Sequence, residues 1–270
     1  MRFAAREAGQ LAMDFKARGE TEAWEKSPGH PVTEADLAVN TLLARRLGAA
    51  RGLYGWLSEE TADDPRNRAP ERVWVVDPID GTRAYMRGDP HWCVGLAVVE
   101  RGEVVAGVIY APEFDALYEA RRGGGAYLNG TPLSVSARDR VDGCRMIASS
   151  SMLRHKDWPT PWPPVVVADP KPNATLLRLA HVARGDWDAT LALWRKSDWD
   201  IAPGAILVHE AGGHATTHLG ESFHYNRPVP AQRSVIAAGK HLHPLLVERT
   251  HKVRLPDPNG SAPAKIPSKP

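Results

Sequence analysis

One run of six residues constrains the fold more than any other part of this 270-residue chain: Asp77-Pro78-Ile79-Asp80-Gly81-Thr82. It follows the apolar segment Val73–Val76, which predicts a buried strand. Pro78 fixes its own φ angle and biases Asp77 toward an extended conformation, so we expect the strand to end at Asp77 and the chain to bend there. Both carboxylates then lie at the carboxyl end of a strand, where open α/β sheets commonly hold ligands.

The residue types in this run suit a metal ion and a phosphate group. Gly81 lets the backbone approach a ligand closely, and Thr82 offers a hydroxyl and an amide at the start of the next element. Carboxylate and hydroxyl oxygens are ligands that Mg²⁺ accepts. The run therefore predicts Mg²⁺-dependent phosphate chemistry.

Composition excludes several classes of protein. The chain is 43% hydrophobic and 24% charged, which is ordinary for a globular protein, and its net charge of +2 calls for neither nucleic acid nor an anionic membrane as partner. No segment approaches the roughly 20 apolar residues that cross a bilayer, and a signal-peptide core is absent. Cys93 and Cys144 are too few for a disulfide scaffold, so we expect both in the core of a cytoplasmic protein.

The first half of the chain predicts two helices followed by an antiparallel sheet. Residues 2–18 place Phe3 and other apolar side chains on one helical face, and the polar stretch from Gly19 to His30 predicts a mobile loop. Thr33 is the expected N-cap of a second helix, and Gly48 its expected end. Runs of β-formers separated by turn residues predict strands at 92–99, 104–110 and 116–120.

The second half of the chain alternates between strand and helix patterns. Strands are expected at 165–168 and 189–193, and helices at 174–184 and 201–211. We expect an N-terminal α+β domain over 1–138, a C-terminal α/β domain over 139–250 and a disordered tail over 251–270, which is rich in Pro, Ser and Lys from residue 256 onward. The Trp- and Pro-rich stretch 151–164 fits no motif.

Three further segments carry acids that could join Asp77 and Asp80. Glu59 and Glu60 are adjacent, Asp36 lies at the start of the second predicted helix, and Asp200 lies at the start of the last one. Taken singly, an acid at a helix start is more often a cap, and neighbouring glutamates are more often solvated. The six-residue run is far more specific, because its elements serve a single geometry.

These four segments, taken together and in order, resemble the motifs of the inositol monophosphatase-like superfamily, which are matched here by Pro31–Asp36, Ser58–Thr61, Asp77–Thr82 and Trp199–Gly213. The stretch Gly123–Ser136 also looks like a hairpin of that family, and the resemblance covers about residues 2–245. It implies a five-layer αβαβα sandwich of the inositol monophosphatase and fructose-1,6-bisphosphatase type. It also implies a lithium-sensitive phosphomonoesterase with two or three Mg²⁺ ions, commonly a homodimer, that acts on a small phosphorylated metabolite.

The resemblance also implies a role for each matching residue. Glu59, Asp77 and the carbonyl of Ile79 would hold one Mg²⁺, and Asp77, Asp80 and Asp200 would hold the second. A water made acidic by the metal would be the nucleophile. Thr82, oriented by Asp36, would accept or relay its proton with help from Glu60, and the backbone amides of Gly81 and Thr82 would bind the phosphate.

A haloacid-dehalogenase-type phosphatase is the competing interpretation of the six-residue run. Those enzymes use Asp-x-Asp-Gly-Thr, in which the first Asp is the nucleophile. Here two residues, Pro78 and Ile79, separate the aspartates, which misplaces the second carboxylate. The segment around Asp200 also fits the other family.

The substrate depends on less specific positions. Inositol-specific members of the family carry a glutamate where this chain has Leu193, and Arg83, Arg195 and Lys196 are cations that suit a second phosphate. Asn173 and Ala174 lie where relatives shape the leaving-group pocket, and Trp194 could stack on a nucleobase or simply line the rim. These positions favour 3′-phosphoadenosine 5′-phosphate as the substrate of a 3′(2′),5′-bisphosphate nucleotidase. Inositol 1-phosphate, histidinol phosphate and a catalytically silent Mg²⁺- or phosphate-binding regulator remain the alternatives.

Overall fold

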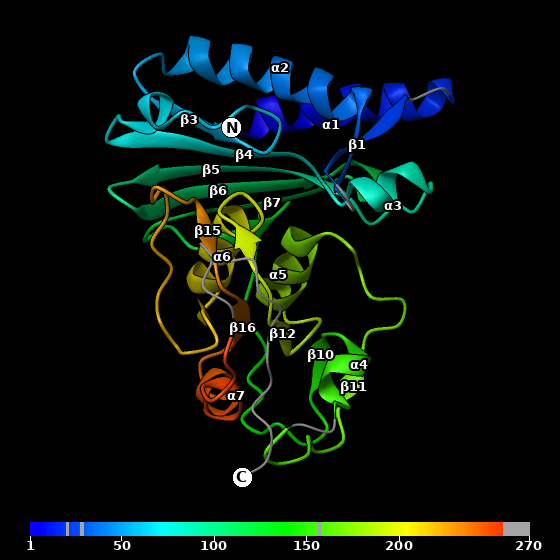
Figure 1. The fold of residues 1–270 in the computed structure, drawn as a ribbon, viewed down its shortest axis with the longest axis vertical. Helices are drawn as coiled ribbons and strands as arrows, with labels where there is room; N and C mark the ends of the chain where they lie inside the picture. The colour runs from blue at the N-terminus through cyan, green and yellow to red at the C-terminus, as the bar shows by residue number, and fades with distance from the viewer. Residues whose placement is uncertain (20–21, 28–29, 156–157, 256–270) are drawn as a thin grey trace.

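The computed structural model describes residues 1–19, 22–27, 30–155 and 158–255, which stack in five layers (Figure 1). The first layer contains helices α1 (Arg2–Arg18) and α2 (Glu34–Ala50), which cover one face of a seven-stranded sheet. Helices α5 (Thr175–Arg184) and α6 (Ala202–Glu210) lie between that sheet and a second, five-stranded one, and α7 (Leu242–Thr250) covers the far side. The αβαβα order expected from the sequence is therefore confirmed.

The seven-stranded sheet has the order β3-β4-β5-β6-β7-β8-β9. Only β3 and β4 are parallel; every later pair is antiparallel, as the run of β-formers predicts. Its strands are β3 (Gly55–Ser58), β4 (Arg72–Asp80), β5 (Cys93–Glu100), β6 (Glu103–Ala111), β7 (Ala116–Arg121), β8 (Ala126–Leu128) and β9 (Thr131–Pro132).

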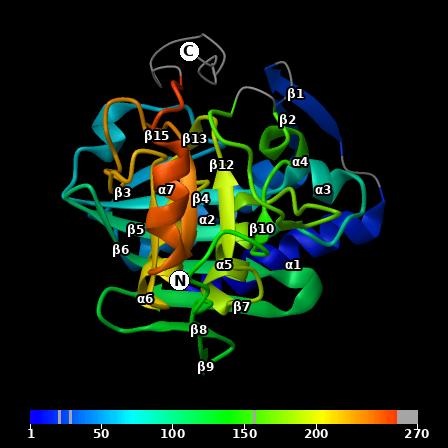
Figure 2. The ribbon, with the colours of Figure 1, turned by 90° about the horizontal axis from the view of Figure 1, so that it is seen from below.

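The second sheet is mixed and has the order β11-β10-β12-β16-β14. Strand β10 is parallel to both neighbours, whereas β16 is antiparallel to β12 and β14. Figure 2 shows β10 and β12 next to each other. Its strands are β10 (Arg145–Ile147), β11 (Val166–Val167), β12 (Ala189–Ala192), β14 (Gly213–Thr216) and β16 (Val235–Gly239). The smaller elements are α3 (Thr82–Met86), α4 (Ser150–Leu153), the pair β13 (Lys196–Ser197) and β15 (Ala231–Gln232), and the 3₁₀ turns Pro65–Arg68 and Pro112–Phe114.

Helix α1 packs through small residues. Ala4, Ala5, Ala8 and Ala12 are all buried, which lets the helix lie close to α2 and to the sheet. Phe3, expected on the buried face, is instead 73% exposed. The amphipathic pattern therefore predicts the helix correctly but misassigns its first large apolar residue.

Three predicted boundaries are wrong. The stretch Gly19–His30 is not simply a loop, because β1 (Ala23–Ser27) pairs antiparallel with β2 (His30–Thr33). Helix α2 runs past Gly48 to Ala50, since one glycine inside a helix costs only about 1 kcal/mol. Strand β4 does not end at Asp77 but continues to Asp80, with an irregular register between these two residues.

The expected division at residue 138 falls between β9, in the first sheet, and β10, in the second. That division into two domains stays a prediction. Residues 251–255 of the expected tail are described, and Val253 is buried in the apolar cluster of the second sheet, while 256–270 lie outside the described residues. Cys93 and Cys144 are both buried and free. Across the described ranges, no helix combines the length and apolar character needed to span a membrane.

Candidate active site

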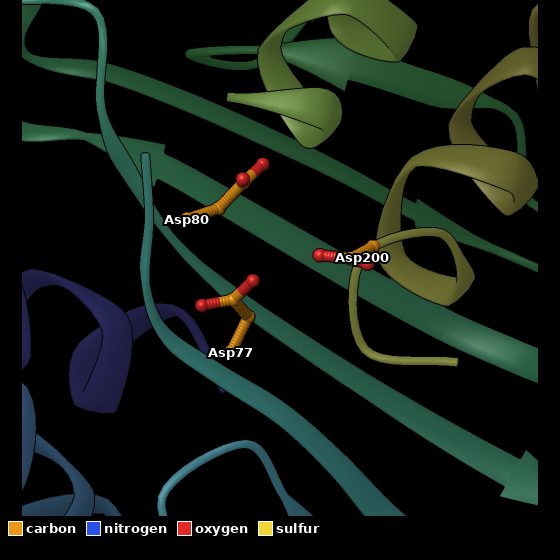
Figure 3. Close-up of side chains that lie close together, drawn as sticks. All are labelled: Asp77, Asp80 and Asp200. Carbon is orange, nitrogen blue, oxygen red and sulfur yellow. The ribbon is translucent and has the colours of Figure 1, made fainter. Parts of the chain in front are cut away.

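Asp77 and Asp80 point to the same side of β4 because the strand carries a bulge. Asp77 pairs with Gly95 and Asp80 pairs with Cys93, so three steps on β4 match two on β5. In a regular strand, residues three apart face opposite sides, and the one extra residue restores a common side. Figure 3 shows the Asp77 and Asp80 side chains close together and beside Asp200. Pro78, which has no place in the middle of a regular ladder, marks this bulge in the sequence.

Asp200 comes from the turn that precedes α6. Its Oδ2 accepts a hydrogen bond of 2.9 Å from the Ser197 amide, which fixes the side chain before the helix begins. Helices α5 and α6 approach β5 closely at Gly95, where an added Cβ would lie 2.2 Å from Leu176 Cδ1. This close packing brings Asp77, Asp80 and Asp200 together, with one ligand atom of each within 4.8 Å of the others.

Asp77 and Asp80 are buried, and Asp77 is poorly compensated, whereas Asp200 is partly exposed. Asp77 is 1% exposed, and neither of its oxygens has a hydrogen-bond partner among the described residues. Its pKa is raised well above the ordinary value by burial and then by the charges of Glu59, Asp80 and Asp200. Burial, reinforced by Asp200, likewise raises the pKa of Asp80 to about 6, although Asp80 Oδ2 accepts a hydrogen bond of 2.5 Å from the Leu176 amide.

This donor set fits a divalent metal ion. A buried carboxylate without a partner is costly, and a cation shared with two neighbouring carboxylates removes that cost. All three side chains offer oxygen, the ligand atom that Mg²⁺ requires. Asp77, Asp80 and Asp200 are therefore the part of the predicted ligand set that the fold brings together directly.

Glu59 and Glu60 follow β3 at the edge of this cluster and share one cation. Lys26 Nζ, on the β1–β2 hairpin, lies 3.0 Å from Glu59 Oε1 and 2.6 Å from Glu60 Oε1. Burial raises the pKa of Glu59 to about 7, with Lys26 opposing the rise and Asp200 adding to it. Glu59 is thus beside the aspartates, and its charge acts on Asp77 more strongly than any other.

Asp36 connects the start of α2 to Thr82. Its Oδ2 accepts hydrogen bonds from the Thr33 amide at 2.8 Å and the Thr33 hydroxyl at 2.5 Å, while its own amide donates to Thr33 Oγ1 at 3.3 Å. This capping box, which confirms Thr33 as the N-cap, leaves Asp36 Oδ1 free to lie 3.2 Å from Thr82 Oγ1. Thr82 Oγ1 also lies 3.2 Å from the Ile79 carbonyl oxygen. Burial raises the pKa of Asp36 to about 6.

Gly81 is required by the backbone next to this threonine. Its φ is +97°, and an added Cβ would lie 3.1 Å from the His91 carbonyl oxygen and 3.3 Å from Ala174 Cβ. Both the angle and the space therefore favour glycine. Helix α3 begins at Thr82, immediately after it.

The predicted substrate residues lie in different surroundings. Ala174 is buried at the start of α5, whereas Asn173, Arg83 and Arg195 are exposed. Lys196 Nζ lies 3.9 Å from Asp200 Oδ2, beside the aspartate cluster. Leu193 is 5% exposed and belongs to the apolar cluster of the second sheet.

Sequence reasoning missed three cations near the site. Lys26 stands in the stretch interpreted as a loop, and Lys171 and Arg178 lie in or beside α5 without a motif to mark them. Arg178 is 6% exposed, which is unusual for an arginine, and its burial is a property of the fold rather than of the local sequence.

Comparison with known proteins agrees with this geometry. A model of the inositol monophosphatase family matches residues 2–255. An inositol-1-monophosphatase of Rhizobium meliloti is 32% identical over 246 residues, which cover 88% of this chain and 89% of that protein. A histidinol-phosphatase of Chlorobaculum parvum is 32% identical over 231 residues, covering 80% and 83% of the two chains.

A solved structure supports the same relationship. The extragenic suppressor protein suhB of Bartonella henselae superposes with a TM-score of 0.77 at 28% identity, covering 92% of this chain and 96% of that one. The match over nearly the whole length, together with the aspartate cluster on β4 and before α6, places this chain in the inositol monophosphatase family, whose members are phosphomonoesterases.

Proposed function

We propose that this protein is a Mg²⁺-dependent phosphomonoesterase whose active site is built on Asp77, Asp80 and Asp200. The observation that carries the proposal is the Asp77 carboxylate, which is buried without a hydrogen-bond partner between two other acids. Glu59 and the carbonyl of Ile79 would complete the ligand set. When bound at such a site, Mg²⁺ supplies a water of lowered pKa and offsets the negative charge of the phosphate ester.

The remaining roles belong to the chain's own groups. The Thr82 hydroxyl can donate a hydrogen bond to Asp36 Oδ1 or to the Ile79 carbonyl oxygen, both 3.2 Å away, which leaves its lone pairs free to accept a hydrogen bond from water. Asp36, held by Thr33, orients that hydroxyl and can hold the proton. Glu60, bound to Lys26, would assist, and the amides of Gly81 and Thr82 would bind phosphate oxygens.

For the substrate, we propose a 3′(2′),5′-bisphosphate nucleotide, with 3′-phosphoadenosine 5′-phosphate hydrolysed to AMP and phosphate. Two features support this choice over a neutral polyol phosphate. Leu193 offers no group that could bind a sugar hydroxyl, and Lys196 places positive charge 3.9 Å from Asp200, with the exposed Arg195 next to it in the chain.

Inositol 1-phosphate is the second candidate, and histidinol phosphate the third. They are favoured by the relatives, since proteins named inositol-1-monophosphatase and histidinol-phosphatase are each 32% identical to this chain. Leu193 and the cations argue against a neutral polyol, while the similarity of the sequences argues for it.

A panel of phosphomonoesters, assayed for phosphate release, tests both the phosphatase activity and the choice of substrate. Purified protein with Mg²⁺ should release phosphate, EDTA should abolish the release, and Asp200→Asn should lower turnover at least 10³-fold with an unchanged circular dichroism spectrum, as expected when a metal ligand is lost. Unchanged turnover in Asp200→Asn would remove the metal assignment, and no turnover of any phosphomonoester would favour a silent binding protein. Cleavage of inositol 1-phosphate much faster than the bisphosphate would refute the nucleotide assignment. Repeating the panel with lithium tests the expected sensitivity.

We also propose that the protein acts as a homodimer in the cytoplasm. The homodimer is carried over from the family resemblance. The cytoplasmic location agrees with two free, buried cysteines, which suit a reducing compartment. Light scattering of the purified protein would test the first proposal, and cell fractionation the second.

A further inference from the structure

Three cations lie near the aspartates and near one another. Lys171 precedes α5, Arg178 lies within α5, and Lys196 lies in β13. The charges of Arg178 and Lys196 contribute to lowering the pKa of Lys171, so the three cations lie near one another. The charges of Asp80 and Asp200 act on the pKa of Arg178 in the opposite direction to its burial. The cluster is therefore an extension of the site and not a separate surface.

Arg178 has a structural role in this cluster. Its Nε donates a hydrogen bond of 2.7 Å to the Pro172 carbonyl, and its Nη2 donates one of 2.7 Å to the Asn173 carbonyl. These two bonds use two of its five N–H donors and fix the segment that carries Lys171. Because Arg178 is also buried, we infer that it positions Lys171 rather than contacting a ligand itself.

Lys171, by contrast, has a half-buried ammonium group without an acidic partner. Its Nζ lies 5.6 Å from the centre of the Trp194 ring, and no carboxylate of the described residues lies within 4 Å of it. Burial, followed by the charges of Arg178 and Lys196, lowers the pKa of Lys171. A partly desolvated cation beside like charges is unfavourable unless an anion completes the arrangement.

Trp194 explains how this arrangement persists. The ring is 39% exposed and lies against the ammonium of Lys171, where the negative face of the indole attracts it. Trp194 is therefore a positioning residue that holds Lys171 beside Lys196.

We propose that Lys171 and Lys196 form a second anion subsite, which binds a phosphoryl group carried by the part of the substrate beyond the scissile phosphate. The proposal rests on the proposed phosphatase function and specifies its substrate class. Lys196, at 3.9 Å from Asp200, marks the inner edge of the subsite, and Lys171 its outer edge. Two ammonium groups, of which only Lys196 is paired with a carboxylate, suit a phosphoryl dianion better than a hydroxyl.

The kinetic test compares two substrates in matched variants. The ratio of kcat/KM for adenosine 3′,5′-bisphosphate to that for adenosine 3′-monophosphate should fall about tenfold in Lys171→Gln, because one charge-assisted contact of about 1.4 kcal/mol is lost. Lys171→Arg should keep most of the preference. The control, Lys240→Gln, removes an exposed lysine after β16 and should leave both rates unchanged. An unchanged ratio in Lys171→Gln would overturn the proposal.

A binding measurement separates failure of the subsite from failure of the function. Titration calorimetry of AMP onto Asp200→Asn protein should give a dissociation constant that rises about tenfold when Lys171→Gln is added. Equal affinities would refute the subsite even if the enzyme is an active phosphatase. A clear loss of affinity would support it even if no phosphomonoester were hydrolysed, in which case only the proposed function fails. Trp194→Phe should weaken AMP binding in the same direction, since Lys171 loses part of its support.

Discussion

Asp80→Asn should make the metal-free protein more stable, although it removes a proposed metal ligand. Burial and the neighbouring charge of Asp200 raise the pKa of Asp80 from 3.8 to about 6. Since one pKa unit corresponds to about 1.4 kcal/mol, the ionised carboxylate destabilises the fold by about 3 kcal/mol at neutral pH. Asparagine keeps an oxygen for the Leu176 amide, so the variant should gain about 2–3 kcal/mol.

The gain in stability should depend on pH, because it comes from removing the ionised form of Asp80. A carboxyl group whose pKa is higher in the folded protein takes up a proton on folding. The loss of stability caused by ionised Asp80 is therefore complete above about pH 6 and disappears as the pH falls below about 4. Urea unfolding in EDTA should show Asp80→Asn more stable than the parent protein at pH 7.5, with the difference reduced to about 1 kcal/mol at pH 4.5. With Mg²⁺ the order should reverse, because only the parent protein retains the full ligand set.

Asp198→Asn is the matched control. Burial also raises the pKa of Asp198 to about 6, but its oxygens accept hydrogen bonds from the Asn226 amide at 2.7 Å and Gln232 Nε2 at 2.9 Å. An asparagine amide would face one of these donors, so this variant should be less stable at pH 7.5 and should respond to Mg²⁺ like the parent protein. The reasoning would be refuted if Asp80→Asn were destabilised at pH 7.5 in EDTA, or if both variants behaved alike.

Three further substitutions test separate parts of the site. Thr82→Ala should lower kcat by about 10²–10⁴ with little change in KM, whereas Thr82→Ser should keep most of the activity; steady-state kinetics would contradict the proton role if both were equally active. Thr33→Ala removes the hydroxyl half of the capping box and should cost about 1 kcal/mol in urea unfolding. It should also lower kcat, since Asp36 loses one of the two hydrogen bonds that Thr33 donates to it; a loss of stability alone would separate Asp36 from catalysis. Gly81→Ala should cost more than Gly88→Ala in the same assay, because both have positive φ, near +97° and +74°, but only Gly81 also lies against the His91 carbonyl oxygen and Ala174; equal costs would refute the crowding at Gly81.

Periodicity and local motifs predicted much of the architecture. Helices α1, α2, α5 and α6 and strands β5, β6 and β7 lie close to their expected ranges, because each has a strong apolar period and a clear turn or cap. The hairpin β1–β2 was missed because β1 is exposed and both strands are too short to show a clear alternation of polar and apolar residues. Helix α7 and strand β16 gave no predicted element, since their short apolar runs become distinctive only once packed against the second sheet.

The residues of the candidate site could likewise be predicted only in part. Asp77, Asp80 and Asp200 could be named from the spacing of acids within motifs, and the fold brings these three together. The contact between Asp36 and Thr82, 46 residues apart, was expected only from the family resemblance. Lys26 and Lys171 could not be found from sequence, because nothing local distinguishes them from surface lysines; only the fold places one beside Glu59 and Glu60 and the other over Trp194.

The bulge in β4 makes the site sensitive to the number of residues it contains as well as to their identity. Pro78 and Ile79 have no partner in the register with β5, so a substitution at either position leaves the count, and hence the direction of both aspartates, unchanged. Inserting or deleting a single residue there would alter the alternation of the strand and turn Asp77 and Asp80 to opposite faces, or change their separation. We therefore expect the length of this segment to vary less among related proteins than its side chains do. A designed variant can change the apolar residue between the acids but not the spacing of the acids.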